Sequence, residues 1–274
     1  MKILNFAKRL LRRFWPRPEQ ALLRQLRAKR CDIHRQSFTL PDGRRVEGIK
    51  GLEAYNEYKD IFIQGIYKFQ SCRPKPRIID GGGYVGFSAL FFLGAYPDAE
   101  LTVFECDPQV LQQLEKNLAV HKGRCVEIVK AALAGRDGEA TFYRTGDDAG
   151  SLVQSAAESF KVKCVSLRPW LEKGEVDFLK LNIEGAEIEV LADCENLLHK
   201  VREMVIEFHS FAGQAQRLQE LLSTLSRAGF RYLINHFDYE SNLAVRPPFK
   251  VTRDQSFVLL VYAKRNHLID EVCV

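Results

Sequence analysis

Three glycines follow a short run of β-branched residues in the stretch RIIDGGGYVGFSALFF, residues 77–92. Gly81, Gly83 and Gly86 fit the pattern G-x-G-x-x-G, and an apolar helical pattern comes after them. A strand that runs through a glycine turn into a helix brings backbone amides close to a nucleotide. Glu105 ends the next predicted strand, where its carboxylate can accept hydrogen bonds from two ribose hydroxyls. The pattern predicts a cofactor that contains a nucleoside, without choosing among several.

The residue before the glycines separates the candidate cofactors. A Walker-type phosphate loop is excluded because no GK[ST] follows. The carboxylate of Asp80 would repel a pyrophosphate, whereas it would attract the ammonium and sulfonium groups of S-adenosylmethionine. Read as D-x-G-x-x-x-G through Asp80, Gly82 and Gly86, the turn favours this methyl donor over a nicotinamide dinucleotide.

Methyl transfer to a hydroxyl needs a group that removes the proton as the oxygen attacks. His209 follows the predicted strand MVIEF, and a neutral imidazole is the commonest general base. Glu207 lies two residues earlier, hence on the same face of the strand, where it can orient the imidazole. Glu184 follows another predicted strand and is the second candidate base. The simpler alternative is that His209 only bonds the backbone at a strand end.

An alternation of strands and helices from Arg77 onward would hold these residues. Predicted strands are 77–80, 101–105, 126–133, 176–182, 201–209, 231–237 and 256–265, and predicted helices are 86–96, 108–121, a segment from 185, and 214–230. This alternation predicts an α/β fold with a mostly parallel sheet and helices on both faces. Two closing strands with no helix between them predict an antiparallel last strand. Ligands of such sheets bind at the carboxyl ends of the strands. The candidate residues at those ends are Asp80, Glu105, Ala131, Asn182, Glu184, Glu207 and His209.

Four regions are predicted along the chain. Residues 1–30 form a basic, amphipathic helical extension, and residues 31–76 form an N-terminal cap with a hairpin at 38–49 and a helix at 55–69. Residues 77–265 form the domain that binds S-adenosylmethionine, and residues 266–274 are a C-terminal tail.

Charge and cysteine content limit the classes of function. Residues 1–30 hold ten Lys or Arg and one acid, so they carry +9, while the whole chain carries +5 and the remainder therefore −4. A nucleic-acid footprint spread over the main domain is not expected. Seven widely spaced cysteines without a C-x-x-C pair predict reduced thiols in an intracellular protein, and no metal-ligand spacing stands out, so we predict no required metal. No segment approaches 18 uninterrupted apolar residues. We expect a cytoplasmic protein.

Two interpretations of residues 1–30 are open. The apolar stripe with Lys and Arg alongside fits a helix that lies on an anionic membrane surface, at the inner face of the membrane. The alternative is that the stripe packs on the catalytic domain or on a second subunit, with the basic face solvated.

The segments IIDGGGYVGFSALFF, LTVFECDPQVLQQLEKNL, VEIVKAAL, VDFLKLNIEGAEIEVL and MVIEFH, in that order, resemble the FkbM-type family of S-adenosylmethionine-dependent methyltransferases. The resemblance runs from about residue 67 to residue 237, and LKLNIEGAEIEVL is its most specific part. It implies the class I, Rossmann-like fold with a seven-stranded sheet. Donor contacts are then expected from the first two strand ends and from two later ones: Asp80, Gly81, Gly82, Gly83, Tyr84, Gly86, Glu105, Cys106, Ala131 and Asn182.

The chain departs from the family pattern at two positions. Tyr84 stands where the family usually has asparagine, and Asn182 stands where it usually has aspartate. An amide can form hydrogen bonds, but it is neither a base nor a strong metal ligand.

The resemblance implies O-methylation of a hydroxyl on a sugar, a glycolipid or polysaccharide precursor, or a secondary metabolite. Two other classes of function stay open: a nicotinamide-dependent oxidoreductase that uses the same glycines, and a degenerate methyltransferase fold that serves as a binding module. The acceptor is expected to be a small molecule or a glycan- or lipid-linked hydroxyl, and no nucleic-acid partner is expected.

Overall fold

The structure is a computed structural model that describes residues 37–40, 42–121, 124–144, 150–151, 158–211, 213–236 and 256–266. The chain divides into two compact units, Met1–Ile66 and Tyr67–Val274. The predictions for residues 1–30 and for the tail beyond residue 266 lie outside the described residues.

The first unit contains a hairpin and a helical segment. Strands β1 (Ser37–Thr39) and β2 (Arg45–Glu47) pair antiparallel. Helix α3 (Gly51–Glu57) continues directly into a π-helix, η1 (Tyr58–Gln64), and Gly65 ends it with a left-handed backbone at φ 70°. The helix of this region therefore begins earlier than the sequence predicted, and its second half has π geometry.

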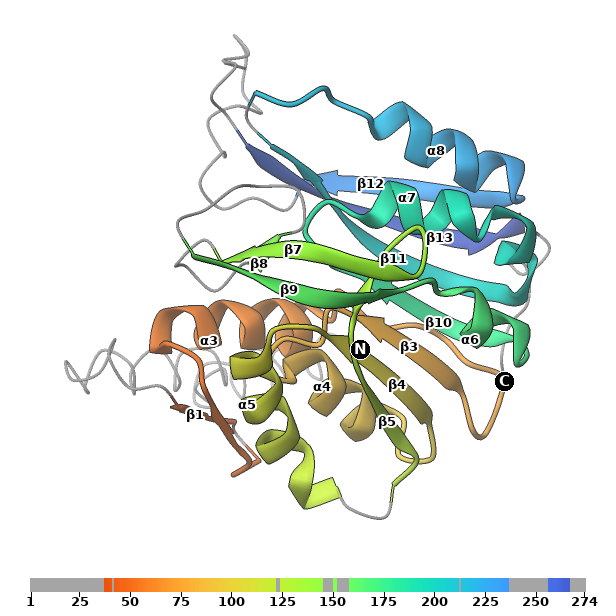
Figure 1. The fold of residues 1–274 in the computed structure, drawn as a ribbon. Coiled ribbons are helices and arrows are strands. Elements are labelled where there is room, and N and C mark those ends of the chain that lie inside the picture. The colour runs from red at the N-terminus through yellow and green to blue at the C-terminus, as the bar shows by residue number, and fades with distance from the viewer. Residues whose placement is uncertain are drawn as a thin grey trace, which may run out of the picture. The chain divides into compact units, whose positions relative to one another are not determined.

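The second unit is built on a seven-stranded sheet in the order β12-β13-β11-β10-β3-β4-β5 (Figure 1). The strands are β3 (Arg77–Gly81), β4 (Glu100–Glu105), β5 (Val126–Lys130), β10 (Val176–Leu181), β11 (Val201–Ser210), β12 (Phe230–His236) and β13 (Phe257–Arg265). Neighbours from β11 through β5 run parallel, while β13 pairs antiparallel with both β11 and β12. The predicted seven-stranded, mostly parallel sheet with its antiparallel last strand is confirmed.

Helices cover both faces of this sheet (Figure 1). They are α4 (Phe87–Ala95), α5 (Pro108–Leu118), α6 (Arg168–Glu172), α7 (Glu187–Asp193) and α8 (Leu218–Arg227), with 3-10 turns η2 (Ala119–His121) and η3 (Glu195–Lys200). Since β3-α4-β4 and β10-α7-β11 step in opposite directions across the sheet, right-handed crossovers place α4 and α7 on opposite faces. All six residues of β10 are buried, as expected for a central strand covered on both sides. The order reverses between β3 and β10, and the candidate residues lie at or just after the carboxyl ends of these strands and their neighbours.

A second, four-stranded sheet is inserted between β5 and β10, in the order β6-β9-β7-β8. Its strands are β6 (Ala132–Leu133), β7 (Gly138–Arg144), β8 (Gly150–Ser151) and β9 (Glu158–Val165). It has a small core of its own, made of Ala132, Phe142, Val162 and Cys164. The single strand predicted at 126–133 is therefore wrong in extent: the chain leaves the main sheet after Lys130 and joins the inserted sheet at Ala132.

Among the described cysteines, Cys106, Cys125, Cys164 and Cys194 are free thiols. Cys72 is disulfide-bonded, so the prediction of reduced thiols is wrong at this position. Within the described part of the chain, no helix is both long and apolar enough to span a membrane.

Candidate active site

The parallel register brings the ends of four strands together. Asp80 on β3 lies opposite Lys180 on β10, and Leu181 lies opposite both Gly81 and Ile206 on β11. The residues that follow β3, β10 and β11 therefore meet at one edge of the sheet, and Glu105 ends β4 beside them. This is the arrangement that the sequence predicted for Asp80, Glu105, Asn182, Glu184, Glu207 and His209.

The glycine turn after β3 uses its amides within the fold. The Gly82 and Gly83 amides donate to Phe104 O at 3.1 and 2.8 Å, and the Gly86 amide donates to Gly83 O at 2.9 Å. The Tyr84 amide donates to Glu105 Oε2 at 2.9 Å. These amides are therefore already bonded and do not form an open cradle for a phosphate.

Close packing explains the glycines themselves. At Gly82, with φ +84°, a Cβ would lie 1.8 Å from the Asn182 carbonyl oxygen. At Gly83 a Cβ would lie 2.2 Å from Val103. Side chains are excluded by neighbouring strands, so the steric reason that the sequence suggested, close approach of a ligand, is not needed to account for them.

Two residues of this edge have strained backbones. Tyr84 has φ 46° and Glu184 has φ 55°, and among the described non-glycine residues these are the ones with positive φ. For a bulky residue such a conformation is unfavourable by about 1–3 kcal/mol and is concentrated at functional sites. Both residues lie in turns between a strand and a helix at the carboxyl edge of the sheet, so the strain marks the same place as the strand ends.

Asp80 is fully buried, and the fold balances its charge. Lys180 Nζ lies 2.9 Å from Asp80 Oδ1, and Ser88 Oγ donates to Oδ2 at 2.5 Å. The ammonium of Lys180 also donates to the carbonyls of Gly81 and Gly82. The ion pair of Asp80 and Lys180 thus holds the glycine turn in position. The sequence predicts that the Asp80 carboxylate attracts the methyl donor, whereas in the structure its charge is paired with Lys180.

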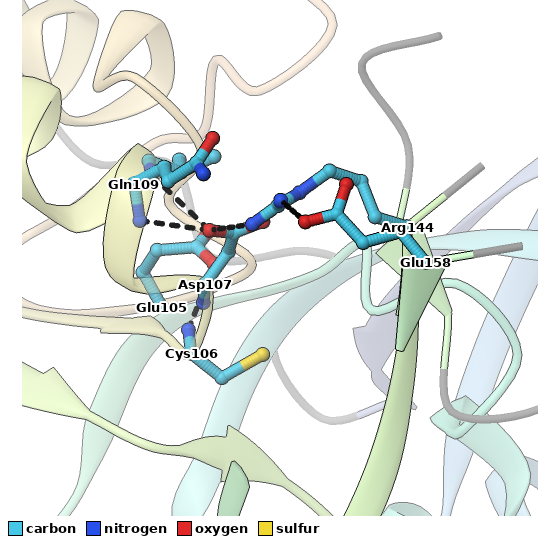
Figure 2. Close-up of polar contacts among 7 residues, drawn as sticks. Glu105, Cys106, Asp107, Gln109, Arg144 and Glu158 are labelled. Atoms are coloured by element: carbon cyan, nitrogen blue, oxygen red, sulfur yellow. Dashed lines mark hydrogen bonds and ion pairs between the residues drawn. The ribbon is translucent and has the colours of Figure 1, made fainter. Parts of the chain in front are cut away.

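Glu105 is half-buried at the end of β4 and accepts three backbone amides. Oε1 accepts from Cys106 and Asp107 at 2.8 and 2.9 Å (Figure 2). Oε2 accepts from Tyr84 at 2.9 Å. Burial raises the pKa of Glu105, and the three amides oppose this rise. Each carboxylate oxygen can accept about two hydrogen bonds. Oε2 therefore keeps room for one more donor, rather than the pair of ribose bonds that the sequence suggested.

The remaining donor-site residues lie next to this turn. The Cys106 side chain packs against the inserted sheet, and burial raises the pKa of its thiol, so it is an unreactive apolar contact. Ala131 is buried directly after β5. Gly81 ends β3, and its carbonyl accepts from the Asn182 amide at 3.0 Å.

Asn182 follows β10 and has one hydrogen-bonding group in use and one without a partner. Its Nδ2 donates to Glu207 Oε2 at 2.9 Å. Its Oδ1 is buried and makes no hydrogen bond to any described residue. Glu207 is buried as well, accepts from the Tyr67 hydroxyl, and has a pKa raised by burial and lowered in part by Lys180. A buried acceptor without a partner is costly, so Asn182 Oδ1 calls for a hydrogen-bond donor.

His209 lies between two carboxylates. Its Nε2 is 3.4 Å from Glu184 Oε2, and its Nδ1 is 3.4 Å from Glu187 Oε1. At this length the contacts are chiefly electrostatic, and Nδ1 has no well-aligned hydrogen bond to a described residue. Burial alone would lower the pKa of His209, but Glu184 and Glu187 outweigh burial and raise it to about 9. Burial also raises the pKa of Glu184.

This pKa changes the role expected of His209. At neutral pH the imidazole is protonated, so the acid–base unit is the His209–Glu184–Glu187 cluster rather than a neutral histidine. Glu207 was expected to orient the imidazole; the residues in contact with the ring nitrogens are Glu184 and Glu187 instead. Glu187 is buried, and it also accepts the amides of Ile183 and Gly185 at 3.0 Å.

A cavity of about 760 Å³ opens beside His209. One wall comes from α7 and the turn before it, another from the inserted sheet, and the rest from the segment between β11 and α8. Its lining is largely apolar, with Ile188, Phe208 and Phe211 as the large members. A volume of this size suits a small-molecule ligand.

Lys180, Glu187 and Tyr67 are site residues that sequence reasoning missed as such. Lys180 carried a signal, because a lysine within the apolar strand VDFLKL is anomalous unless it has a buried partner. A carboxylate such as Glu187 at a helix start is ordinary, because it favours the helix dipole, and so it carries no signal of its own. Tyr67 contacts Glu207 from 140 positions away, which no local pattern reveals.

Within the described residues, no group of three or more His, Cys, Asp or Glu is arranged to hold a metal ion.

The chain has several relatives of known description. AMB antimetabolite synthetase AmbE from Pseudomonas aeruginosa is 25% identical over 267 residues, which cover 77% of this chain but only 12% of AmbE. Methyltransferase sdnD from Sordaria araneosa is 27% identical over 214 residues, covering 64% of this chain and 82% of sdnD. The chain is thus similar to a small part of a large synthetase and to most of a single methyltransferase.

Solved structures of low sequence identity resemble the fold. The methyltransferase FkbM from Methylobacillus flagellatus is 16% identical with a TM-score of 0.48, covering 75% of this chain and 47% of that one. TYW2 from M. jannaschii, in complex with AdoMet, is 10% identical with a TM-score of 0.46, covering 84% of this chain and 86% of that one.

The model of the methyltransferase FkbM domain matches residues 80–232, which is more than half of the chain. The match extends from Asp80 in the glycine turn, through the inserted sheet and the strand ends around His209, to Tyr232 in β12. The chain belongs to the FkbM methyltransferase family.

Proposed function

We propose that the protein is an S-adenosylmethionine-dependent O-methyltransferase. The observation that carries this proposal is that the hydrogen-bonding groups still available at the strand ends are acceptors and not donors. The amides of Gly82, Gly83, Tyr84 and Gly86 are already bonded within the fold, whereas Glu105 Oε2 and Asn182 Oδ1 are acceptors with capacity left. A ligand rich in donors fits such a site, and a pyrophosphate, which accepts hydrogen bonds, does not.

S-adenosylmethionine meets this requirement, because its ammonium, ribose hydroxyls and adenine amino group are all donors. It would supply an electrophilic methyl group. Glu105 would bind a ribose hydroxyl, and Asn182 Oδ1 would accept a hydrogen bond that no described residue provides. The same polarity argues against the nicotinamide-dependent alternative, whose pyrophosphate needs free amides.

On the acceptor side, we propose that His209 and Glu184 remove the proton of the attacking hydroxyl. The cluster of His209, Glu184 and Glu187 contains one imidazole and two carboxyl groups, so it has one more acidic group than it has basic groups. Glu187 is buried and held by two amides, while the side chain of Glu184 is 25% exposed. In this proposal Glu184 would take the proton from the acceptor, and His209 would share that proton with it.

The cavity beside His209 would hold the acceptor. Its size favours a hydroxyl on a small molecule, such as a sugar, a glycolipid precursor or a secondary metabolite, over a macromolecule. Its lining combines apolar side chains with the charged Arg136, Glu189, Asp193 and Arg217. A small molecule reaches a buried acid–base group inside a cavity more readily than a folded chain does.

Titration calorimetry with S-adenosylmethionine, S-adenosylhomocysteine and NAD tests the proposal. We expect both S-adenosyl compounds to bind and NAD to give no heat of binding. Binding of NAD alone would favour the oxidoreductase. A degenerate binding module would bind S-adenosylhomocysteine but form none of it from S-adenosylmethionine with any hydroxyl acceptor from a panel of sugars and secondary metabolites.

A further inference from the structure

One side chain of the inserted sheet reaches the turn that carries Glu105. Arg144 ends β7, and its guanidinium forms a bidentate ion pair with Asp107, with Nε 2.9 Å from Oδ2 and Nη2 2.8 Å from Oδ1. Nη1 contacts Glu158 on β9, and the guanidinium lies over the ring of Phe160, 5.0 Å from its centroid. Figure 2 shows the guanidinium between the two carboxylates. A bidentate ion pair of this kind fixes both the position and the orientation of the carboxylate.

Asp107 in turn holds Glu105 and begins helix α5. Its backbone amide donates to Glu105 Oε1 at 2.9 Å, and its Oδ1 accepts from the Gln109 amide at 2.8 Å as the N-cap. Arg144, Asp107 and Glu105 therefore form a continuous chain of contacts from the inserted sheet to the acid at the end of β4.

The same chain of contacts balances charge. Asp107 is 6% exposed, and it places a second carboxylate two residues from Glu105. The groups around Glu105 are the amides of Tyr84, Cys106 and Asp107, the Cys106 thiol and the Asp107 carboxylate. Of these, the Asp107 carboxylate disfavours an ionised Glu105, and Arg144 neutralises it.

We propose that Arg144 is a positioning residue of the donor site, which keeps Glu105 ionised and correctly oriented by neutralising and fixing Asp107. The inserted sheet then takes part in donor recognition through this one side chain. The proposal rests on the proposed function, in which Glu105 binds the ribose of S-adenosylmethionine.

Arg144→Gln tests this in the full-length protein, with S-adenosylhomocysteine as the calorimetric ligand. We expect affinity at pH 7 to fall about tenfold, as for loss of an ordered charged acceptor. We also expect the pH at which binding is lost on acidification to rise, because an unpaired Asp107 makes Glu105 easier to protonate. Arg144→Lys keeps the positive charge but cannot form the bidentate ion pair. This variant should therefore retain the wild-type pH midpoint while binding S-adenosylhomocysteine more weakly.

Two control variants separate this effect from loss of any surface ion pair. Glu158→Gln removes the other partner of Arg144, a side chain that is 60% exposed, and should leave affinity unchanged. Arg227→Gln removes a bidentate ion pair with Glu195, in which Nε lies 2.6 Å from Oε1 and Nη2 lies 2.9 Å from Oε2. Arg227 is on helix α8, away from the strand ends, so this variant should bind S-adenosylhomocysteine as the wild type does.

The double variant Asp107→Asn/Arg144→Gln distinguishes neutralisation of the Asp107 charge from a purely structural role of Arg144. Asparagine is a good N-cap and removes the uncompensated charge, so the wild-type pH midpoint should return. A purely structural clamp predicts instead that the double variant is no better than Arg144→Gln. Unchanged affinity and midpoint in Arg144→Gln would overturn the inference alone, whereas absence of binding in the wild type would overturn the proposed function.

Discussion

Asp80 and Glu105 lie at the carboxyl ends of neighbouring strands, but the fold uses their carboxylates differently. Asp80 is wholly buried and paired with Lys180, so its charge contributes to the fold. Glu105 is half-buried and binds only backbone amides, which leaves one position on Oε2 for an outside donor. At the scale of single residues, the ligand-binding acid is therefore distinguished by its remaining hydrogen-bonding capacity and not by its position at a strand end.

Glu105→Gln should weaken the binding of S-adenosylhomocysteine while the protein stays folded. The glutamine oxygen can keep the amides of Cys106 and Asp107, but its NH2 group cannot accept from Tyr84 or from a ribose hydroxyl. Loss of a bond to a charged acceptor corresponds to about 1.5–3 kcal/mol of binding free energy. Glu105→Ala is a poorer test, because it leaves three amides without acceptors.

Calorimetry measures this effect, with Glu139→Gln as the control. Glu139 is an exposed acid on β7, and its replacement should not change affinity. Equal affinity in a folded Glu105→Gln protein would remove Glu105 from the donor site.

The pH dependence of turnover should follow the His209 cluster. A pKa of about 9 means that the proton is present at neutral pH and leaves only as the pH rises through 9. If loss of this proton increases basicity at the site, turnover should rise with pH to a midpoint near 9, not near the ordinary histidine value of about 6.5. His209→Gln should lose this limb of the profile and keep its affinity for S-adenosylhomocysteine. A midpoint unchanged in His209→Gln would assign the titration to another group.

The elements show why part of the site was predictable. Strand ends, the glycine turn and the helix after each strand follow from local patterns, so Asp80, Glu105, Asn182 and His209 were placed together correctly. Contacts such as that of Arg144 with Asp107, 37 residues apart, depend on how an inserted sheet packs. Two of its strands, β6 and β8, have only two residues each, and the sequence predicts no strand between residues 133 and 176.

We expect glycine at position 82 to be required for the stability of the protein, whether or not a ligand is bound. A Cβ at this position would lie 1.8 Å from the Asn182 carbonyl oxygen, and the backbone would have to move to relieve the contact. We expect Gly82→Ala to destabilise the protein by about 3 kcal/mol or more, which combines strain at positive φ with steric overlap.

Gly229→Ala is the matched control for this variant. Its φ of +82° is nearly that of Gly82 at +84°, yet a Cβ there would meet nothing within 4 Å. It should therefore show only the backbone strain, about 1–2 kcal/mol. Denaturant unfolding of both variants measures the difference, and equal losses of stability would show that the Asn182 contact relaxes without cost.

At the scale of the whole molecule, charge is divided unevenly along the chain. Residues 1–30 carry +9, and the rest of the chain carries −4. The basic residues of this segment alternate with Ile3, Leu10 and Phe14, among other apolar residues. Such a segment has both parts of an anionic-surface binder, an apolar stripe and a cationic border. The segment lies outside the described residues, so its sequence alone supports this reading.

We propose that residues 1–30 bind anionic membrane surfaces. Each lysine or arginine near such a surface contributes about 1 kcal/mol, and this contribution is screened by salt. Full-length protein should therefore co-sediment with anionic vesicles at low ionic strength, less so as salt increases, and not with neutral vesicles. Reversal of the basic cluster to glutamate should abolish binding; its members are Lys8, Arg9, Arg12 and Arg13.

A matched reversal separates local from overall charge. Four exposed lysines of the main domain, replaced together by glutamate, change the net charge of the protein by the same amount: Lys68, Lys75, Lys116 and Lys163. If binding depends on residues 1–30, this control protein should still co-sediment. If both variants lose binding equally, the vesicles respond to net charge alone. If the unmodified protein ignores anionic vesicles at low salt, the apolar stripe instead packs on the protein or on a second subunit, because an amphipathic face without a membrane must be covered by other apolar surface.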